Sequence, residues 1–305
     1  MKTAQLLKAL IIIIFVILAL ASCEDVVDVN LNDEDIDLIS VEAYINTNIE
    51  NNVYVKLERT LPVNQTAQNP AISNAQVMLT DDAATPNTII LQEQGASGIY
   101  LLPEDVTYPG VPGRTYTLTV TTSDGTVITA QEYLQQVENL DTVKVNLSDR
   151  GNFEYLGVYI NSQETPGLGH YYKWDIYING NLLYSGEDLA FASDELVDGN
   201  YIYDMLIMLD WEDEEEDKIL HTGDTVVVHQ LSISEEAYKF YWGMSDQAWA
   251  GGPFSVPPAN IPGNLNSSDG KRVLGLFSAR DISVGNPVII DESNYTPVIS
   301  SVPKN

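Results

Sequence analysis

Apolar and polar residues alternate in short runs through the first part of the chain, and turn-forming Pro, Gly and Asn separate these runs. In one of them Val53, Val55 and Leu57 alternate with polar or amphipathic neighbours, the period-two pattern of a strand with one buried face. The runs predicted as strands are 37–46, 52–60, 75–80, 88–92, 98–102, 115–121 and 126–131. Short strands at this spacing are typical of a sandwich, so we predict a mainly β fold that begins with an immunoglobulin-like β-sandwich over residues 36–135.

The alternation continues beyond residue 135. In residues 171–178, apolar side chains such as Trp174 fall on one face of the predicted strand and polar side chains such as Asp175 fall on the other. The Asn179-Gly180 pair that follows is typical of a two-residue hairpin turn. Further strands are predicted over 142–148, 154–161, 181–184, 201–211, 224–233, 271–282 and 287–291. We therefore predict a second β-rich domain over residues 136–305.

One inserted α-helix is predicted within this second region, near residues 234–250. The segment Ser232-Ile233-Ser234-Glu235 offers a capping box, or Ser234 caps the helix directly, and Glu235 and Glu236 favour the first turn. Two neighbouring faces of this helix carry Ala237, Tyr241, Met244 and Ala248 on one, and Tyr238, Trp242, Ser245 and Trp249 on the other. Such a wide stripe favours packing of the helix onto a sheet over ligand binding.

Residues 1–22 have the features of a secretory signal peptide. A lysine-bearing start precedes an apolar stretch over 9–21 that is short for a membrane span. Small residues lead to Cys23, the only cysteine in the chain, which is the arrangement of a bacterial lipoprotein signal. We predict cleavage before Cys23, lipidation of its thiol with acyl chains such as palmitate, and a solvated acidic tether over residues 23–35.

The overall charge of the chain argues against anionic partners such as nucleic acids. The chain carries 44 acidic and 14 basic residues, for a formal net charge of −30. A chain this acidic offers no basic stripe for nucleic-acid phosphates and no basic face for anionic lipid headgroups. We therefore expect no nucleic-acid partner, and we expect attachment to the membrane through the N-terminal lipid alone.

Sequence motifs for catalysis are absent. The chain has no Gly-x-Ser-x-Gly, no His-Glu-x-x-His and no glycine-rich phosphate loop. His170, His221 and His229 are too few and too scattered to indicate a zinc site or a triad. The acidic run 212–217 lacks the spacing and the Gly turn of a calcium loop, so a solvated hairpin tip is the preferred interpretation and calcium binding the alternative. We expect no enzymatic activity, no cofactor and no metal site; a hydrolase that uses paired carboxylates is a minor alternative.

Aromatic residues indicate where a ligand would bind. All four Trp and ten of the seventeen Tyr lie between residues 155 and 249. Exposed Tyr and Trp form rigid contact surfaces for partners or for sugar-like ligands, whereas buried ones only pack the core. The candidate binding surface consists of Tyr171, Trp174, Trp242, Trp249 and Phe254, with a glycan or a peptide as the expected ligand.

Several segments follow one another in a distinctive order. They are the lipoprotein signal with Cys23-Glu24-Asp25, Leu57-Glu58-Arg59-Thr60, Gly110-Val111-Pro112-Gly113-Arg114-Thr115-Tyr116, Tyr171-Tyr172-Lys173-Trp174, Asp194-Glu195-Leu196-Val197-Asp198-Gly199-Asn200, Gly223-Asp224-Thr225-Val226, Gly252-Pro253-Phe254-Ser255-Val256-Pro257-Pro258-Ala259-Asn260 and Leu274-Gly275-Leu276-Phe277-Ser278. Their order resembles a Bacteroidota lipoprotein family classed as a domain of unknown function, numbered 4249. The resemblance implies an outer-membrane lipoprotein often found beside TonB-dependent receptors, with no established activity and no catalytic residues to carry over.

These observations favour a lipid-anchored, non-enzymatic accessory or binding protein of the outer membrane, on its periplasmic face or at the cell surface. We expect it to work with a TonB-dependent nutrient-uptake system. The alternative is a surface adhesion or structural lipoprotein. Two Asp-Thr-apolar tripeptides, at Thr142 and Thr225, match a short O-glycosylation pattern but are common by chance.

Overall fold

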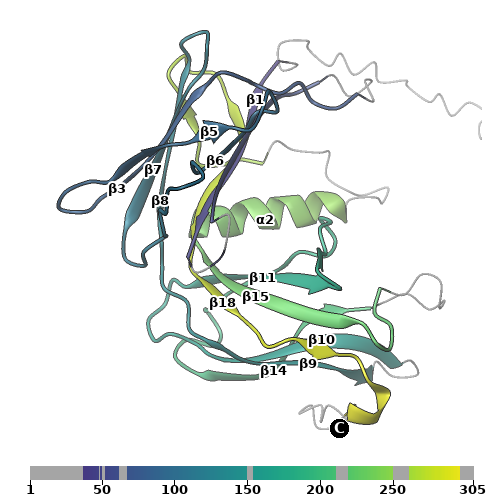
Figure 1. The fold of residues 1–305 in the computed structure, drawn as a ribbon. Coiled ribbons are helices and arrows are strands. Elements are labelled where there is room, and N and C mark those ends of the chain that lie inside the picture. Colours follow the sequence, from purple (N-terminus) through teal and green to yellow (C-terminus); the bar gives the residue numbers. More distant parts are fainter. Residues whose placement is uncertain are drawn as a thin grey trace, which may run out of the picture. The chain divides into compact units, whose positions relative to one another are not determined.

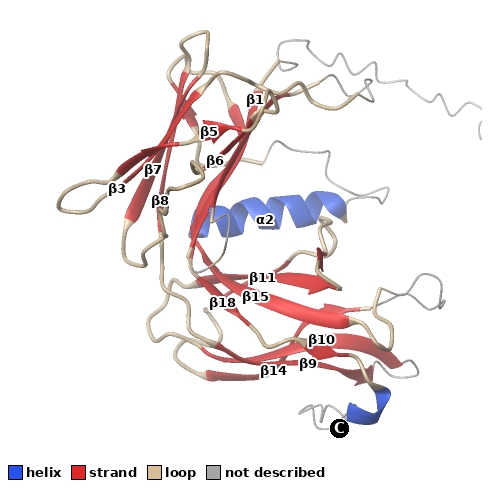
Figure 2. Cartoon of the chain, viewed as in Figure 1, coloured by secondary structure: helices blue, strands red, loops and turns tan. Residues whose placement is uncertain are grey.

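The computed structural model describes residues 37–47, 49, 52–61, 67–149, 154–210, 219–249 and 261–295. Within these ranges the chain is mainly β, with several antiparallel sheets and one α-helix, as the sequence predicts (Figures 1 and 2). The predicted signal peptide, Cys23, the acidic tether, the acidic run 212–217 and Phe254 lie outside the described residues.

Two five-stranded sheets form the first part of the fold. The first has the order β17-β1-β2-β6-β5, and its strands are β1 (Ile39–Asn46), β2 (Val53–Arg59), β5 (Gln92–Glu93), β6 (Ile99–Leu101) and β17 (Val273–Arg280). The second has the order β16-β8-β7-β3-β4, and its strands are β3 (Gln76–Asp81), β4 (Thr88–Ile90), β7 (Thr115–Thr121), β8 (Val127–Tyr133) and β16 (Asn266–Ser267). The alternating apolar residues of both sheets, such as Leu57 and Leu118, meet in one core and make a sandwich.

Strand β17 completes this sandwich from far along the sequence. It pairs in parallel with β1 over its whole length, with Ala43 opposite Phe277. Strand β16 likewise pairs with β8. The sequence-based division at residue 135 assigned both segments to the second region, whereas their hydrogen bonds lie in the sheets of the first. All described residues belong to one compact unit, Ile36–Asn305.

Two further sheets form the second part. One has the order β14-β10-β9, and its strands are β9 (Leu140–Asp149), β10 (Glu154–Gln163) and β14 (Tyr201–Leu209). The other has the order β12-β11-β15-β18 with β13 on β11 and β19 on β15, and its strands are β11 (Tyr171–Ile178), β12 (Asn181–Leu182), β13 (Ala190–Ser193), β15 (Thr225–Ile233), β18 (Ile282–Val284) and β19 (Val288–Ile289). Val158, Trp174 and Val228 are buried in the core between these sheets. A short 3-10 helix, Glu292–Asn294, follows.

Helix α2 (Glu235–Ala248) lies between the β1/β17 sheet and the β11/β15 sheet (Figure 1). The Ser234 side chain accepts a hydrogen bond from the backbone N–H of Ala237, so of the two predicted caps the direct cap by Ser234 is the one that forms. The predicted hairpin is also confirmed, because Asn179 and Gly180 both have positive φ, at 51° and 81°. Among the described helices, none is long and apolar enough to cross a membrane.

Candidate functional site

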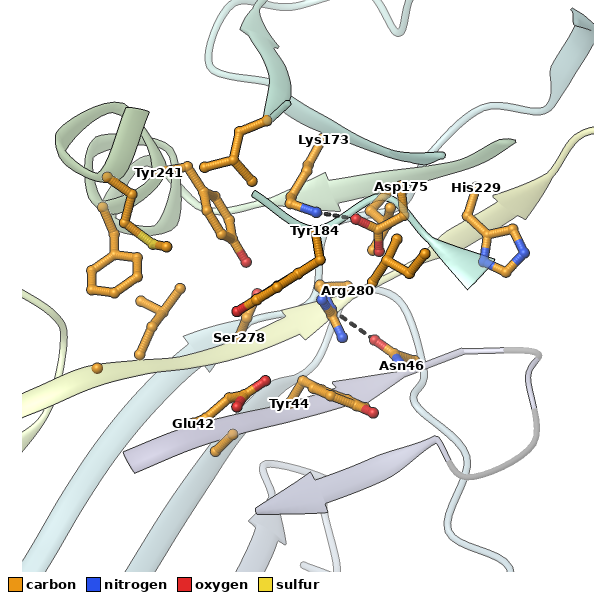
Figure 3. Close-up of a pocket in the computed structure, with 18 of the residues that line it drawn as sticks. Glu42, Tyr44, Asn46, Lys173, Asp175, Tyr184, His229, Tyr241, Ser278 and Arg280 are labelled. Carbon is orange, nitrogen blue, oxygen red and sulfur yellow. Dashed lines mark hydrogen bonds and ion pairs between the residues drawn. The ribbon is translucent and has the colours of Figure 1, made fainter. Parts of the chain in front are cut away.

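A cavity of about 360 Å³ lies where the β1/β17 sheet, the β11/β15 sheet and helix α2 meet (Figure 3). We call it the junction cavity. Its walls follow from strand alternation: Val41 and Ala43 of β1 point into the sandwich core, while Glu42 and Tyr44 point into the cavity. The volume falls in the range of small-molecule sites in proteins. The cavity opens to solvent beside Glu42 and Tyr184, the latter with 70% of its surface exposed.

Arg280, at the end of β17, is the main cationic group of the cavity. Its Nε donates a hydrogen bond of 2.8 Å to Oδ1 of Asn46, and its guanidinium lies 4.3 Å from the ring centre of Tyr44. No carboxylate lies within ion-pair distance of Arg280 among the described residues. The guanidinium also interacts with the Tyr241 hydroxyl, and the donors that remain can serve a ligand.

The second cation, Lys173 of β11, is already paired. Its Nζ forms a buried ion pair with Asp175, and it also lies 5.3 Å from the ring centre of Tyr241. Burial lowers the pKa of Lys173, and the neighbouring Asp175 carboxylate opposes that effect. The pair thus adds polarity to the cavity wall but little net charge. Of the Lys and Arg side chains that line the cavity, Arg280 is then the one without a carboxylate partner among the described residues.

Ser278 adds a hydroxyl that has no partner. It lies on β17 two residues before Arg280 and so points to the same side of the sheet (Figure 3). The residue is 2% exposed, and its Oγ has no hydrogen-bond partner in the part of the chain that the structure describes. Because a buried polar group without a partner is costly, this hydroxyl suits a ligand atom. No base contacts it, so the geometry does not activate it as a nucleophile.

Aromatic rings form much of the remaining wall, together with aliphatic side chains such as Met244 and Ile282. Tyr44 stacks on Tyr54 with ring centres 5.2 Å apart, and burial raises the pKa of both phenols, that of Tyr54 to about 12. Burial also raises the pKa of Tyr241, which reaches in from helix α2. At the other end of the cavity His229 packs against Tyr177 at 4.6 Å, and burial lowers its pKa. The phenols and the imidazole are therefore neutral at pH 7.

The aromatic residues selected from the sequence divide into three groups. Trp174 is 5% exposed and lies in the core, where its Nε1 donates to Oε1 of Gln230, so its ring offers no binding surface. Side chains alternate along β11, so Trp174 points into the core between the two sheets, whereas its neighbours Lys173 and Asp175 point into the cavity. Tyr171 and Trp242 are brought together through the rings of Tyr238 and Phe191, where helix α2 packs on β11 and β13. Trp249 is 66% exposed at the end of that helix.

Sequence reasoning missed the junction cavity. Arg280, Ser278 and Tyr44 were not selected, because single residues in strands carry no motif. One sequence feature could have indicated the cavity. In the predicted strand 171–178 the polar residues Lys173 and Asp175 share one face, and in the structure this polar face is buried. The pairing of β1 with β17, which brings Tyr44 beside Arg280, has no local signature.

A second group of polar residues lies away from the cavity. His170 Nδ1 is 3.3 Å from Oδ2 of Asp194 and 3.4 Å from Oε1 of Glu164. The three ligand-type atoms lie within 4.8 Å of one another, and both carboxylates are buried. His170 is far from the other two histidines in the sequence, but the structure places it between two acids.

Comparison with known proteins bears on the chain as a whole. No curated protein matches it. A family model described as "Domain of unknown function (DUF4249)" matches residues 24–284, which is most of the chain and includes every strand of the sandwich and the junction cavity. This match confirms the family indicated by the order of the sequence motifs: the chain belongs to the DUF4249 family.

Proposed function

We propose that this protein is a non-enzymatic binding protein that holds a small, carboxylate-bearing ligand in the junction cavity. The proposal rests on Arg280. This cation lies in the cavity wall, and among the described residues no carboxylate forms an ion pair with it. A guanidinium binds a carboxylate with two parallel hydrogen bonds, and the unpartnered Ser278 hydroxyl lies on the same strand face.

The composition of the chain strengthens this inference. Acidic residues outnumber basic ones by 44 to 14, so a carboxylate partner for any cation is easy to supply from within the protein. Lys173 has taken one in Asp175, and Arg280 has not. The surrounding tyrosine rings suit the face of a sugar or the side chain of a peptide. We therefore favour an acidic glycan or a peptide with a free carboxylate as the ligand.

We further propose that lipid on Cys23 anchors the protein to the outer membrane, where it works with a TonB-dependent receptor. The signal-like residues 1–22 and the cysteine that follows them support the anchor. The resemblance described above supports the receptor. A surface adhesion role is the second candidate; the small, walled cavity favours a small ligand over a broad adhesive face.

The ligand proposal is tested with the full chain, purified in detergent. Isothermal titration compares oligosaccharides that contain uronic acids with their neutral counterparts, and short peptides with free or amidated C-termini. We expect binding only where a free carboxylate is present. Arg280→Gln should weaken it by at least about tenfold, because a hydrogen bond to a charged group contributes roughly 1.5–3 kcal/mol. Arg272→Gln removes an equal charge from an exposed residue outside the cavity and should leave the affinity unchanged.

Two results would contradict the proposal. One is equal affinity for carboxylated ligands and their neutral or amidated counterparts, since the cation would then have no role. The other is equal weakening by Arg280→Gln and Arg272→Gln, which would reflect the general field of the protein. Co-purification of a transporter from detergent-solubilised membranes tests the receptor separately.

A further inference from the structure

We propose that Glu164, His170 and Asp194 bind one divalent transition-metal ion, such as Zn²⁺. This site is separate from the junction cavity and does not depend on the ligand proposed above. Its three residues come from three chain segments: Glu164 directly follows β10, His170 directly precedes β11, and Asp194 directly follows β13. The strand ends hold them together, because the Asp194 N–H donates to the carbonyl of His170 at 3.0 Å.

The spacing of the donor atoms fits a metal. A tetrahedral ion held about 2.0–2.1 Å from nitrogen and oxygen ligands separates those ligands by roughly 3.3 Å. The measured separations from Nδ1 of His170 are 3.3 Å to Asp194 and 3.4 Å to Glu164. One Nδ1–H proton makes a good hydrogen bond to one acceptor only, and both separations are long for such a bond. An ion between the three atoms would satisfy all of them at once.

The charge of the cluster is also unbalanced. The side chains of Glu164 and Asp194 are 0% and 2% exposed, and that of His170 is 14% exposed. Within the described part of the chain, His170 is the only basic side chain that forms an ion pair with either carboxylate. Two buried negative charges thus face at most one positive charge, and burial of an uncompensated charge is costly. A divalent cation with neutral His170 brings the sum to zero.

Surrounding hydrogen bonds orient the carboxylates as metal ligands usually are. The Tyr172 hydroxyl donates to Oε1 of Glu164 at 3.1 Å, and the backbone N–H of Gly199 donates to Oε2 of the same carboxylate. The backbone N–H groups of Gly169 and His170 donate to Oδ2 of Asp194 at 2.8 and 2.9 Å. Nitrogen and carboxylate donors together favour Zn²⁺ or Co²⁺ over Ca²⁺, which prefers six or more oxygen ligands.

The test uses the full chain, treated with EDTA and dialysed, then titrated with CoCl₂ in the presence of excess Mg²⁺. The Mg²⁺ saturates weak binding to the acidic surface. We expect one Co²⁺ per chain, with the intense visible absorption of a four-coordinate site, displaced by one equivalent of ZnCl₂. His170→Ala should weaken binding by more than about 100-fold. Tyr172→Phe, which keeps every ligand and the ring packing, should weaken it by about 10-fold or more.

His221→Ala is the matched control, because His221 lies 3.6 Å from the carboxylate of Asp224 and half of its side chain is exposed. It should leave the stoichiometry and the affinity unchanged. Absence of one-to-one Co²⁺ and Zn²⁺ binding by the folded parent chain would overturn the proposal. So would unchanged affinity in His170→Ala, or an equal loss in the His221 control. If His170→Ala does not fold, Tyr172→Phe decides alone, and parent-like affinity in that variant would count against the site.

Discussion

Glu132 of β8 links the sandwich to helix α2, and it does so as a buried carboxyl group. It is 4% exposed, and its Oε1 accepts hydrogen bonds from the Ser234 hydroxyl at 3.1 Å and from Nδ2 of Asn264 at 2.6 Å. Its Oε2 is buried and has no hydrogen-bond partner among the residues that the structure describes. Burial raises the pKa of Glu132 from its ordinary value of 4.5 to about 7, although the two hydrogen bonds oppose the rise.

The raised pKa sets the sign of a pH effect on stability. In the unfolded chain Glu132 loses its proton near pH 4.5, whereas in the folded chain it keeps the proton up to about pH 7. The neutral acid therefore stabilises the fold fully below pH 4.5, and this contribution is lost as the pH rises through 7. The difference between the two pKa values corresponds to roughly 3 kcal/mol in the free energy of unfolding.

The perturbation is Glu132→Gln, which keeps an acceptor for Ser234 and Asn264 and never becomes charged. Urea unfolding of the full chain, measured from about pH 5 to about pH 8, gives the free energy at each pH. As the pH rises across this window, the free energy of unfolding of the variant should increase relative to that of the parent by up to about 3 kcal/mol. The unpartnered amide N–H₂ of the variant adds a cost that does not depend on pH and so does not affect this trend. Glu104→Gln, at an exposed glutamate, should show no such trend. A pH-independent difference between parent and Glu132→Gln would refute the reasoning.

Three further predictions concern the backbone, the helix and the anchor. Gly275→Ala should destabilise the fold by about 3 kcal/mol or more in urea unfolding, because φ is +97° and a Cβ would lie 2.0 Å from the Val41 carbonyl oxygen. The control is Gly125→Ala, which has φ +88° but open space around the Cβ and should cost only about 1 kcal/mol. Equal losses in the two variants would contradict the steric argument. Ser234→Ala should cost at least about 1 kcal/mol, measured against Ser245→Ala within the helix, because it removes both the cap and the hydrogen bond to Glu132; an unchanged midpoint would show that neither bond contributes. Cys23→Ala should abolish palmitate labelling and release the protein from sedimented envelopes; labelling that persists would disprove the anchor.

The elements of this fold are largely predictable because their signals are local. Alternation located strands such as β2 and β11, and Ser234 with its following acids located the start of helix α2. Two short strands had no such signal: β13, with four residues, and β16, with two, owe their extended shape to the neighbours they pair with. The long predicted strand over 271–282 is in fact two strands, β17 and β18, which join different sheets.

The candidate sites are not local and were therefore missed. Tyr44 and Arg280 meet because β1 and β17 pair in parallel across more than two hundred residues of chain. Glu164, His170 and Asp194 meet because β10 and β13 end, and β11 begins, at the same place. Trp174 illustrates the converse error: alternation correctly gives two faces of β11, but composition alone does not say which face another sheet covers.

Asp281 explains how the junction cavity keeps its shape. This buried residue separates β17 of the first sheet from β18 of the last, directly after Arg280. Its carboxylate accepts from the Thr47 hydroxyl at the end of β1 and from the backbone N–H of Val137, and its own N–H donates to Ser232 of β15. Through its side chain and its backbone N–H, this one residue thus ties both walls of the cavity and the connection between the two parts. These bonds are internal to the fold and fix the backbone next to Arg280, while Asn46 holds the guanidinium. A cation that is held in this way without a ligand would bind the proposed carboxylate without a large ordering cost.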